Sequence, residues 1–437
     1  MMERMQQDLM IPQSNCSRPL ATVLGVMLTV GLMGSSTVVA EEDKPMGRRP
    51  IPEPKWSKYT EFCWGFAGMD LQNVTETESR PAVRTQVAPR SLGVSKGSIC
   101  RLANGDLLVA AVYAGELPKQ VMKVFRSRDA GVSWTMVRTG GARLLGKEPA
   151  LQALSDGVLL LLTSHPHGFR VHRSQDGGVT WTVTPIGRAY DDEALHWEPG
   201  YHTVRNVLEQ PDGSLMMVMS MNGPESGSEW ARTWLFRSTD RGRTWQKHEQ
   251  VKGWRFKESM FAEASFARLS EGRILAVSRT RQEPPISGPP PAGPPPPHEP
   301  VNEADNFLVL SESKDNGLTW STPRAISNYA EVHGHLLALA DGRLMCTYAS
   351  YHYPHGVFAM FSEDGGKTWD RESPMLLAYS LTSWCGWPTS IQLPDGDIIT
   401  YYVGTRYQEG PGLSLLRPGS GDNTAEVVRW KLPAEQK

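Results

Sequence analysis

The sequence predicts an all-β fold, a six-bladed β-propeller whose blades are four-stranded antiparallel sheets. Three observations predict it. An octet pattern, Ser-x-Asp-x-Gly-x-Ser/Thr-Trp, occurs five times. A second pattern, two apolar runs separated by an acidic residue or Asn and then Gly, occurs six times in step with the first. The chain is also rich in Gly (41), Pro (33) and Trp (14), a mixture typical of turns and packed aromatic strands.

The six apolar repeats predict hairpins, because Asp-Gly and Asn-Gly turns between β-rich runs favour the positive φ angles of tight turns. Each of the first five hairpins is followed by one octet, which predicts a second, outer hairpin. A four-stranded unit of this kind cannot bury both faces alone, so repeated units close as propeller blades. The inner turns fall at Asn104, Asp156, Asp212, Glu271, Asp341 and Asp395, and the octets begin at Ser127, Ser174, Ser238, Ser313 and Ser362.

Each octet combines three residue types with distinct structural roles. Asp accepts backbone N–H bonds across the turn, Gly adopts a conformation that a Cβ disfavours, and Trp packs its ring against neighbouring strands. We therefore expect the octets to be structural and to lie on one face, away from the centre of the propeller.

The N-terminus differs from the rest of the chain. An apolar run, Leu20 to Gly34, follows Arg4 and Arg18, and small residues lead to Ala40 before the polar "EEDK". This arrangement is typical of a secretory signal peptide; an uncleaved membrane anchor is the alternative, although the run is short for a span. The expected organisation is a signal peptide cleaved after Ala40 (1–40), a segment that packs on or closes the propeller (41–93), and the propeller itself (94–433).

Overall composition argues against several classes of protein. The 437 residues carry a net charge of −2, which does not suggest a nucleic-acid partner. After signal cleavage we expect a secreted or periplasmic protein that is not membrane-embedded. His-x-His pairs are present without paired carboxylates at metal-binding spacing, so the sequence predicts neither a metal site nor a cofactor. The sequence does not indicate an oligomeric state.

Four cysteines follow residue 40, and their spacing fits no zinc pattern. Cys100 and Cys346 lie in apolar strand patterns and are expected to be buried thiols. Cys63 and Cys385 are candidates for a disulfide, because an exported protein meets oxidising conditions.

The octets are Asp boxes, and from about Val94 to Pro433 the chain resembles the sialidase (BNR-repeat) superfamily. The resemblance implies a propeller with Asp boxes on one face and a central funnel on the other. It directs attention to the residues eight positions before each inner turn, which we call the ring positions. They are Lys96, Glu148, Val204, Glu263, His333 and Trp387, with His202, Arg205 and His335 beside them.

Blade four matches the family best. By resemblance, Glu263 polarises the catalytic nucleophile and Arg279 binds a substrate carboxylate, since a guanidinium fork pairs well with a planar carboxylate. Other family positions are altered in this chain. Lys96 stands where the family has an Arg, Glu116 is the acid in the loop that carries the family's acid/base Asp, and Trp387 stands where the family has its nucleophilic Tyr.

Two further alterations bear on the chemistry. His355 replaces a third family Arg, and Tyr402 and Arg406 lie where the family has a supporting Glu. Tyr351 or Tyr348 is a candidate to replace the nucleophile. A Pro-rich insertion, 283–300, is either a surface loop or a rim beside the substrate cleft.

These residues predict a secreted, sialidase-like (exo-α-sialidase-like) glycoside hydrolase that acts on an anionic glycan bearing sialic or uronic acid. Acid/base cleavage needs a positioned acid and a nucleophile or base. Two alternatives stay open, a non-catalytic glycan-binding propeller and a uronate polysaccharide lyase. The candidate catalytic residues are Glu263, Glu116, Glu148 and Tyr351, and the candidate substrate-binding residues are Arg279, Arg281, Lys96, His202, Arg205, His333, His335, Trp387 and Arg406.

Overall fold

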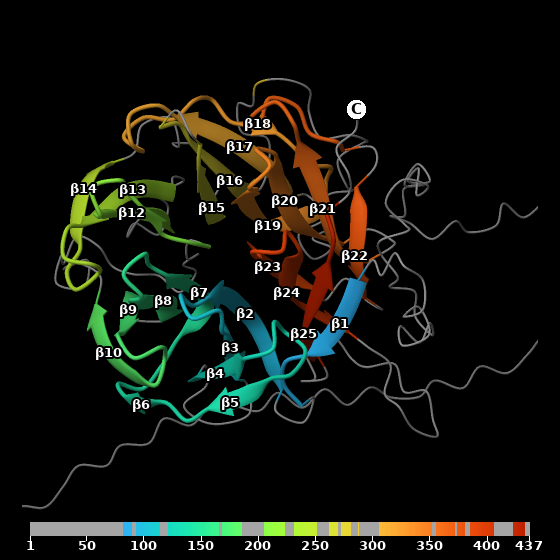
Figure 1. Cartoon of the computed structure of the whole chain (residues 1–437). Helices are drawn as coiled ribbons and strands as arrows, with labels where there is room; N and C mark the ends of the chain where they lie inside the picture. The colour runs from blue at the N-terminus through green and yellow to red at the C-terminus, as the bar shows by residue number, and fades with distance from the viewer. Residues whose placement is uncertain are drawn as a thin grey trace, which may run out of the picture. The chain divides into compact units, whose positions relative to one another are not determined.

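A computed structural model places six antiparallel sheets around a common centre, which confirms the predicted six-bladed propeller (Figure 1). The first strand of each blade is innermost, and in Figure 1 the blades follow one another in chain order. The structure describes residues 82–89, 93–113, 121–165, 168–185, 205–222, 231–250, 262–269, 272–280, 287, 306–351, 355–371, 374–380, 385–405 and 423–432.

The first three blades have these strands. Blade one holds β2 (Val94–Arg101), β3 (Leu107–Tyr113), β4 (Val121–Ser127) and β5 (Thr135–Val137). Blade two holds β7 (Lys147–Ala153), β8 (Leu159–His165), β9 (Gly168–Ser174) and β10 (Thr180–Pro185), with the short β6 (Gly140–Gly141) as a fifth strand. Blade three holds β11 (Leu208–Glu209), β12 (Leu215–Asn222), β13 (Ala231–Ser238) and β14 (Gln246–Gln250).

The remaining blades complete the circle. Blade four holds β15 (Ala262–Arg268), β16 (Ile274–Thr280), β17 (Phe307–Ser313) and β18 (Arg324–Ala325). Blade five holds β19 (Glu331–Ala338), β20 (Leu344–Ser350), β21 (Gly356–Ser362) and β22 (Met375–Tyr379). Blade six holds β23 (Gly386–Gln392), β24 (Ile398–Thr405), β25 (Asn423–Trp430) and β1 (Ala82–Gln86).

Blade six joins the two ends of the propeller. Its outer strand, β1, comes from the start of the described chain and pairs antiparallel with β25 from Ala82↔Trp430 to Gln86↔Glu426 (Figure 1). This pairing satisfies the backbone groups of both strands and links the last blade to the chain that leads into the first.

The core lies between the blades and consists of apolar residues from facing sheets. Leu107, Leu159, Leu215, Ile274 and Leu344, for example, are almost fully buried at the start of the second strand of five consecutive blades. β-rich apolar runs on both sides of each inner turn therefore supply the packing that the sequence pattern predicts.

The Asp boxes form the turns after the third strands. In blade five, Asp364 Oδ1 accepts the Thr368 N–H at 2.9 Å and Asp364 Oδ2 accepts the Thr368 hydroxyl at 2.7 Å. Ser362 Oγ accepts the Gly366 N–H at 2.8 Å, and the Trp369 indole donates to Gly366 O at 3.2 Å. These bonds satisfy polar groups of the turn from within the octet, so the box is a structural element.

The boxes and the ring positions lie at opposite ends of a blade. A ring position opens the first strand and a box follows the third, and neighbouring strands in each blade run antiparallel. The start of the first strand and the end of the third therefore lie on opposite faces of the propeller.

A first set of inter-blade ties lies at the box end. The Arg before the box serine reaches the next box in three successive blades. Arg126 donates to Gly177 O, Arg173 Nε donates to Arg241 O at 3.3 Å, and Arg237 Nη2 donates to Asn316 O at 3.0 Å.

A second set of ties lies near the centre, at the residue two places after each ring position. These side chains form hydrogen bonds with the backbone of the next inner strand. Ser98 Oγ accepts from Leu151 N (3.0 Å), Asn206 Oδ1 from Phe266 N (2.8 Å), Ser265 Oγ from Leu336 N (2.9 Å) and His335 Nδ1 from Ser390 N (3.3 Å), and Thr389 Oγ1 donates to Gly97 O (3.5 Å). Five of six junctions are tied in this way; blade two has Ala150 at this position.

Two box tryptophans provide a stability test. Trp181 is 2% exposed, whereas Trp369 is only partly buried. We expect Trp181→Ala to lower the free energy of unfolding by roughly 3–5 kcal/mol, and Trp369→Ala to lower it by less, because the second change leaves a smaller cavity. Chemical denaturation of both variants measures the difference. If both variants lost the same free energy of unfolding, the burial of the indole would not determine how much each box contributes to stability.

The box carboxylates provide a pH test. Hydrogen bonds from the Ser133 side chain and backbone lower the pKa of Asp129 from 3.8 to about 2. Because the folded pKa lies below the unfolded one, this stabilisation is present above about pH 4 and is lost as the pH falls toward about 2. We therefore expect the difference in Tm between wild type and Asp129→Asn to narrow over that range. A Tm difference that stays constant with pH would contradict the view that the lowered pKa of Asp129 stabilises the fold.

Candidate functional site

Five of the six inner strands begin with a β-bulge at the ring position. The register of each pair shifts there, between Val94 and Gly97, Lys147 and Ala150, Ala262 and Ser265, Val332 and His335, and Gly386 and Thr389. A bulge bends the strand and redirects a side chain, and bulges are frequent beside active sites.

Four ring residues also adopt a backbone conformation that favours glycine. Their φ angles are positive, 53° at Glu148, 59° at Glu263, 59° at His333 and 49° at Trp387. Such conformations cost about 1–3 kcal/mol each and persist where the surrounding structure holds them, most often at functional sites. The positive φ angles alone therefore make the ring positions a candidate functional site.

The buried centre of the site is a hydrogen-bonded series from three neighbouring elements. Glu263 Oε2 lies 2.7 Å from His333 Nδ1, and His333 Nε2 lies 2.8 Å from the Tyr351 hydroxyl. Glu263 is the second residue of β15, His333 lies in β19, and Tyr351 follows β20. The side chains of Glu263 and His333 are 2% and 0% exposed, whereas Tyr351 is half-buried. The phenol is thus the part of this series nearest to solvent.

Arg279 lies behind Glu263. Its Nη2 is 3.6 Å from Glu263 Oε1, and its side chain is only 4% exposed. The pair places a cation against the carboxylate that faces His333, and this favours an ionised Glu263.

Trp387 connects His333 to the first blade. Its ring is stacked on the His333 ring at 3.8 Å between centroids, with 27° between planes. Lys96 Nζ lies 3.4 Å from the centroid of the same indole and 3.3 Å from Glu148 Oε1. Residues at five ring positions, from blades one, two, four, five and six, therefore form one continuous cluster.

Arg205 and His335 lie beside the cluster and are buried. Arg205 Nη2 donates to Pro388 O. Burial, with a smaller contribution from Arg205, lowers the pKa of His335 to about 3, so the imidazole is neutral. His335 Nδ1 accepts the Ser390 N–H, which makes His335 one of the inter-blade ties. Substrate binding by His335 stays a prediction, and the structure adds a hydrogen bond between neighbouring inner strands.

The structure also locates two candidate tyrosines and three of the cysteines. Tyr348 is buried outside the cluster, and Tyr402 donates to Glu426 within blade six, so neither joins the ring. Cys100 and Cys346 are buried thiols as expected, and burial raises the pKa of Cys100 to about 12. Cys385 is buried, and its proposed partner Cys63 lies outside the described residues.

Some predicted residues lie outside the described part of the chain. They are Glu116, His202, Val204, Arg281 and Arg406, together with the signal peptide, residues 41–81 and all of the insertion 283–300 except Ser287.

The described residues contain no group of three or more His, Cys, Asp or Glu side chains arranged to hold a metal ion. Within the same ranges, no helix has the length and apolar character needed to cross a membrane.

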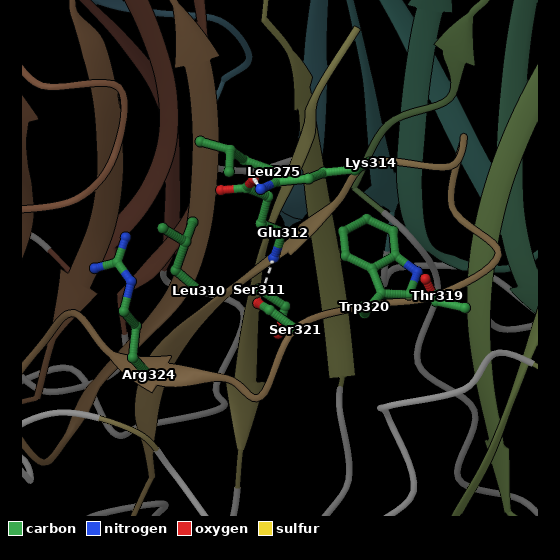
Figure 2. Close-up of a pocket in the computed structure, with 9 residues that line it drawn as sticks. All are labelled: Leu275, Leu310, Ser311, Glu312, Lys314, Thr319, Trp320, Ser321 and Arg324. Carbon is green, nitrogen blue, oxygen red and sulfur yellow. Dashed lines mark hydrogen bonds and ion pairs between the residues drawn. The ribbon is translucent and has the colours of Figure 1, made fainter.

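A cavity of about 480 Å³ lies away from the cluster, at the box end of blade four (Figure 2). It lies beside Glu312, which occupies the position of the bridging arginines of blades one to three. Glu312 pairs instead with Arg273 at 3.1 Å and with Lys314 at 3.5 Å. The residues that line this cavity, Arg324 and Trp320 among them, include none of the ring positions.

The second half of the propeller matches a known family. The family model described as "BNR repeat-like domain" matches residues 297–424, which include the boxes of blades four and five. The resemblance to the sialidase-like BNR-repeat proteins is therefore confirmed. No curated protein matches the chain in sequence.

Solved structures share this propeller. A protein of unknown function from Dyadobacter fermentans DSM 18053 is 18% identical, with a TM-score of 0.58 over 80% of this chain and 99% of that one. An α-L-arabinofuranosidase from Fusarium graminearum, solved with an iminosugar inhibitor, is 16% identical, with a TM-score of 0.53 over 80% and 97%. The Hadza microbial sialidase Hz136 is 14% identical, with a TM-score of 0.50 over 78% and 66%. At these identities the likeness concerns the fold.

Proposed function

We propose that this BNR-repeat propeller is a glycoside hydrolase, sialidase-like in architecture, that cleaves an anionic glycan bearing sialic or uronic acid. The observation that carries the proposal is the series Tyr351–His333–Glu263–Arg279, held by bulged strands at the centre of the propeller. A nucleophile, a base in contact with it and a third group that orients the base are the parts that covalent catalysis requires. Among the solved propellers that share this fold are an arabinofuranosidase and a sialidase, which supports chemistry on a sugar.

Tyr351 is the proposed nucleophile. In the first step its oxygen bonds to the anomeric carbon while the bond from that carbon to the leaving oxygen breaks. His333 Nε2, 2.8 Å away, takes the phenol proton, and Glu263 stabilises the imidazolium that forms. The leaving oxygen takes a proton from an acid. In the second step water attacks the same carbon, releases the phenolate and restores the acid; the phenolate recovers its proton from His333.

The acid that protonates the leaving oxygen comes from the far side of the cluster. Glu148, whose Oε1 lies 3.3 Å from Lys96 Nζ, is the first candidate for this acid. Glu116 remains the second candidate. An acid/base residue must lie within one hydrogen bond of the leaving oxygen, directly or through a water.

An anionic group on the substrate fits the charge of the cluster. Among the described residues of the cluster and its edge, the cations Lys96, Arg205 and Arg279 outnumber the carboxylates Glu148 and Glu263. Lys96 is the most accessible of these five, with 26% of its side chain exposed compared with 4% for Arg279. We propose that Lys96 is the first cation that an incoming carboxylate meets.

A uronate lyase is the second candidate, and the Tyr351–His333 contact favours it. While His333 holds the phenol proton, the Tyr351 phenolate can take the proton from the carbon next to a uronate carboxylate as the bond from the neighbouring carbon to the leaving oxygen breaks. The phenol then gives this proton to the leaving oxygen, and His333 returns the first proton to Tyr351. A lyase leaves a conjugated double bond in the product, and a hydrolase does not.

A screen of the purified protein separates these functions. We expect turnover of at least one aryl glycoside of an acidic sugar, with a saturated product seen by mass spectrometry. Uronate polysaccharides that yield an unsaturated product would assign the lyase activity instead. Binding of glycans by calorimetry, without any turnover, would assign a non-catalytic propeller and overturn the proposal.

We also propose that the chain is exported and that residues 1–40 are removed. The support is the apolar run followed by small residues before Ala40. N-terminal sequencing of protein recovered from outside the cytoplasm should begin at Glu41. Recovery of a chain that retains residues 1–40 would contradict this.

A further inference from the structure

The indole of Trp387 is covered on both faces by side chains of the protein. His333 is stacked on it at 3.8 Å between centroids, and Lys96 Nζ lies 3.4 Å from its centroid. A sugar needs an open aromatic face for stacking, and this ring offers none. Trp387 therefore has a role inside the cluster and not as a platform for substrate.

The backbone around Trp387 is shaped to bring this ring against His333. Trp387 has a φ of 49°, which is rare for a bulky side chain. The preceding Gly386 has a φ of 128°, and a Cβ there would lie 2.9 Å from His333 Cδ2 and 2.8 Å from the Cβ of Ala349. The glycine thus allows the backbone of blade six to approach the imidazole closely. Strain and close packing together fix the plane of the His333 ring.

The charges around His333 act in opposite directions. Glu263, in contact with Nδ1, favours the protonated imidazolium, and Arg279 behind it weakens that effect. Tyr351 faces Nε2. Lys96 lies behind the indole, paired with Glu148, and opposes a second positive charge on the imidazole; Arg205, also buried nearby, acts in the same direction.

We propose that Trp387 and Lys96 are positioning residues for His333: the indole fixes the imidazole, and the ammonium on the far face of the indole keeps that imidazole neutral. Nε2 then remains an acceptor for the Tyr351 proton. This inference rests on the proposed function for its catalytic meaning, although the effect on His333 is independent of any substrate.

Histidine-selective NMR titration of the full mature chain tests the inference directly. Lys96→Met is expected to raise the pKa of His333 by about one unit, because a positive charge that contacts the same indole as the imidazole is removed from a poorly hydrated site. Lys96→Arg should restore the wild-type value. The matched control is Lys123→Met, because Lys123 Nζ lies 5.2 Å from the Tyr113 ring, another cation–aromatic pair outside the ring positions. A pKa that is unchanged or lowered in Lys96→Met would overturn the proposal.

A second variant tests the indole. Trp387→Leu removes the stacked ring, and we expect the His333 resonances to broaden as the imidazole gains motion. Sharp, unshifted resonances would contradict the positioning role. If a substrate is found, the acid limb of the pH profile of kcat/KM should move up by the same amount as the His333 pKa in Lys96→Met. A shifted pKa without any turnover would leave the inference standing and reject only the proposed hydrolase.

Discussion

Replacement of Tyr351 by phenylalanine is expected to lower kcat by about three orders of magnitude or more, since loss of the nucleophile in comparable enzymes costs at least that much. Only one hydroxyl is removed, so the free energy of unfolding should fall by no more than about 1–2 kcal/mol. Glycan affinity should be preserved, because the cations that attract the substrate are unchanged.

Tyr348→Phe is the matched control. This tyrosine lies three residues earlier, on β20, and its side chain is buried outside the cluster. We expect its kcat to remain within a few-fold of wild type. If the two variants had equal activity, or if Tyr348→Phe lost more, Tyr351 would not be the nucleophile. The measurement is steady-state turnover of the substrate found by the screen, with circular dichroism to verify folding.

Glu263→Ala is expected to produce the largest loss of stability at the site. Glu263 contacts both Arg279 and His333, and all three side chains are at most 4% exposed. Removing one member of a buried ion pair leaves the other charge uncompensated, which costs about 3–5 kcal/mol. Urea denaturation measures this loss.

Two comparisons make that prediction specific. The pair of Arg273 and Glu312 has side chains that are 23% and 27% exposed, so Glu312→Ala should cost less than about 1 kcal/mol. The double variant Glu263→Ala/Arg279→Met should recover part of the loss, because the orphaned charge is gone. If Glu263→Ala were as stable as Glu312→Ala, the buried pair of Glu263 and Arg279 would not contribute the expected free energy of unfolding.

Much of the fold could be predicted because its signals are local. An octet carries its own hydrogen-bonding residues, and the inner turns at positions such as Asp156 and Asp341 carry the glycine that the turn needs. Counting these units predicts six blades and the position of each ring residue. The sequence suggests that residues 41–93 pack on or close the propeller, but the pairing of β1 with β25 and the short β6 have no comparable local signal, because each depends on a distant strand.

The roles within the site were harder to predict. His333 meets Glu263 and Tyr351 across 70 and 18 residues of chain, so no spacing rule connects them. Contact of Trp387 and His335 with substrate stays a prediction. The sequence did not reveal that the indole contacts Lys96 and His333, or that His335 accepts a hydrogen bond from a neighbouring strand. These contacts depend on bulges that shift the register by one residue, and sequence alone does not reveal where a bulge redirects a side chain.

Trapping the covalent intermediate tests the central claim most directly. The protein would be incubated with a panel of activated fluoroglycosides of acidic and neutral sugars, and peptides from the digested protein would be examined by mass spectrometry. The account predicts one sugar attached to the peptide that contains Tyr351, and no labelling of Tyr351→Phe. A sugar attached to a carboxylate such as Glu148 or Glu263, or turnover of the parent glycoside without any labelled peptide, would contradict it.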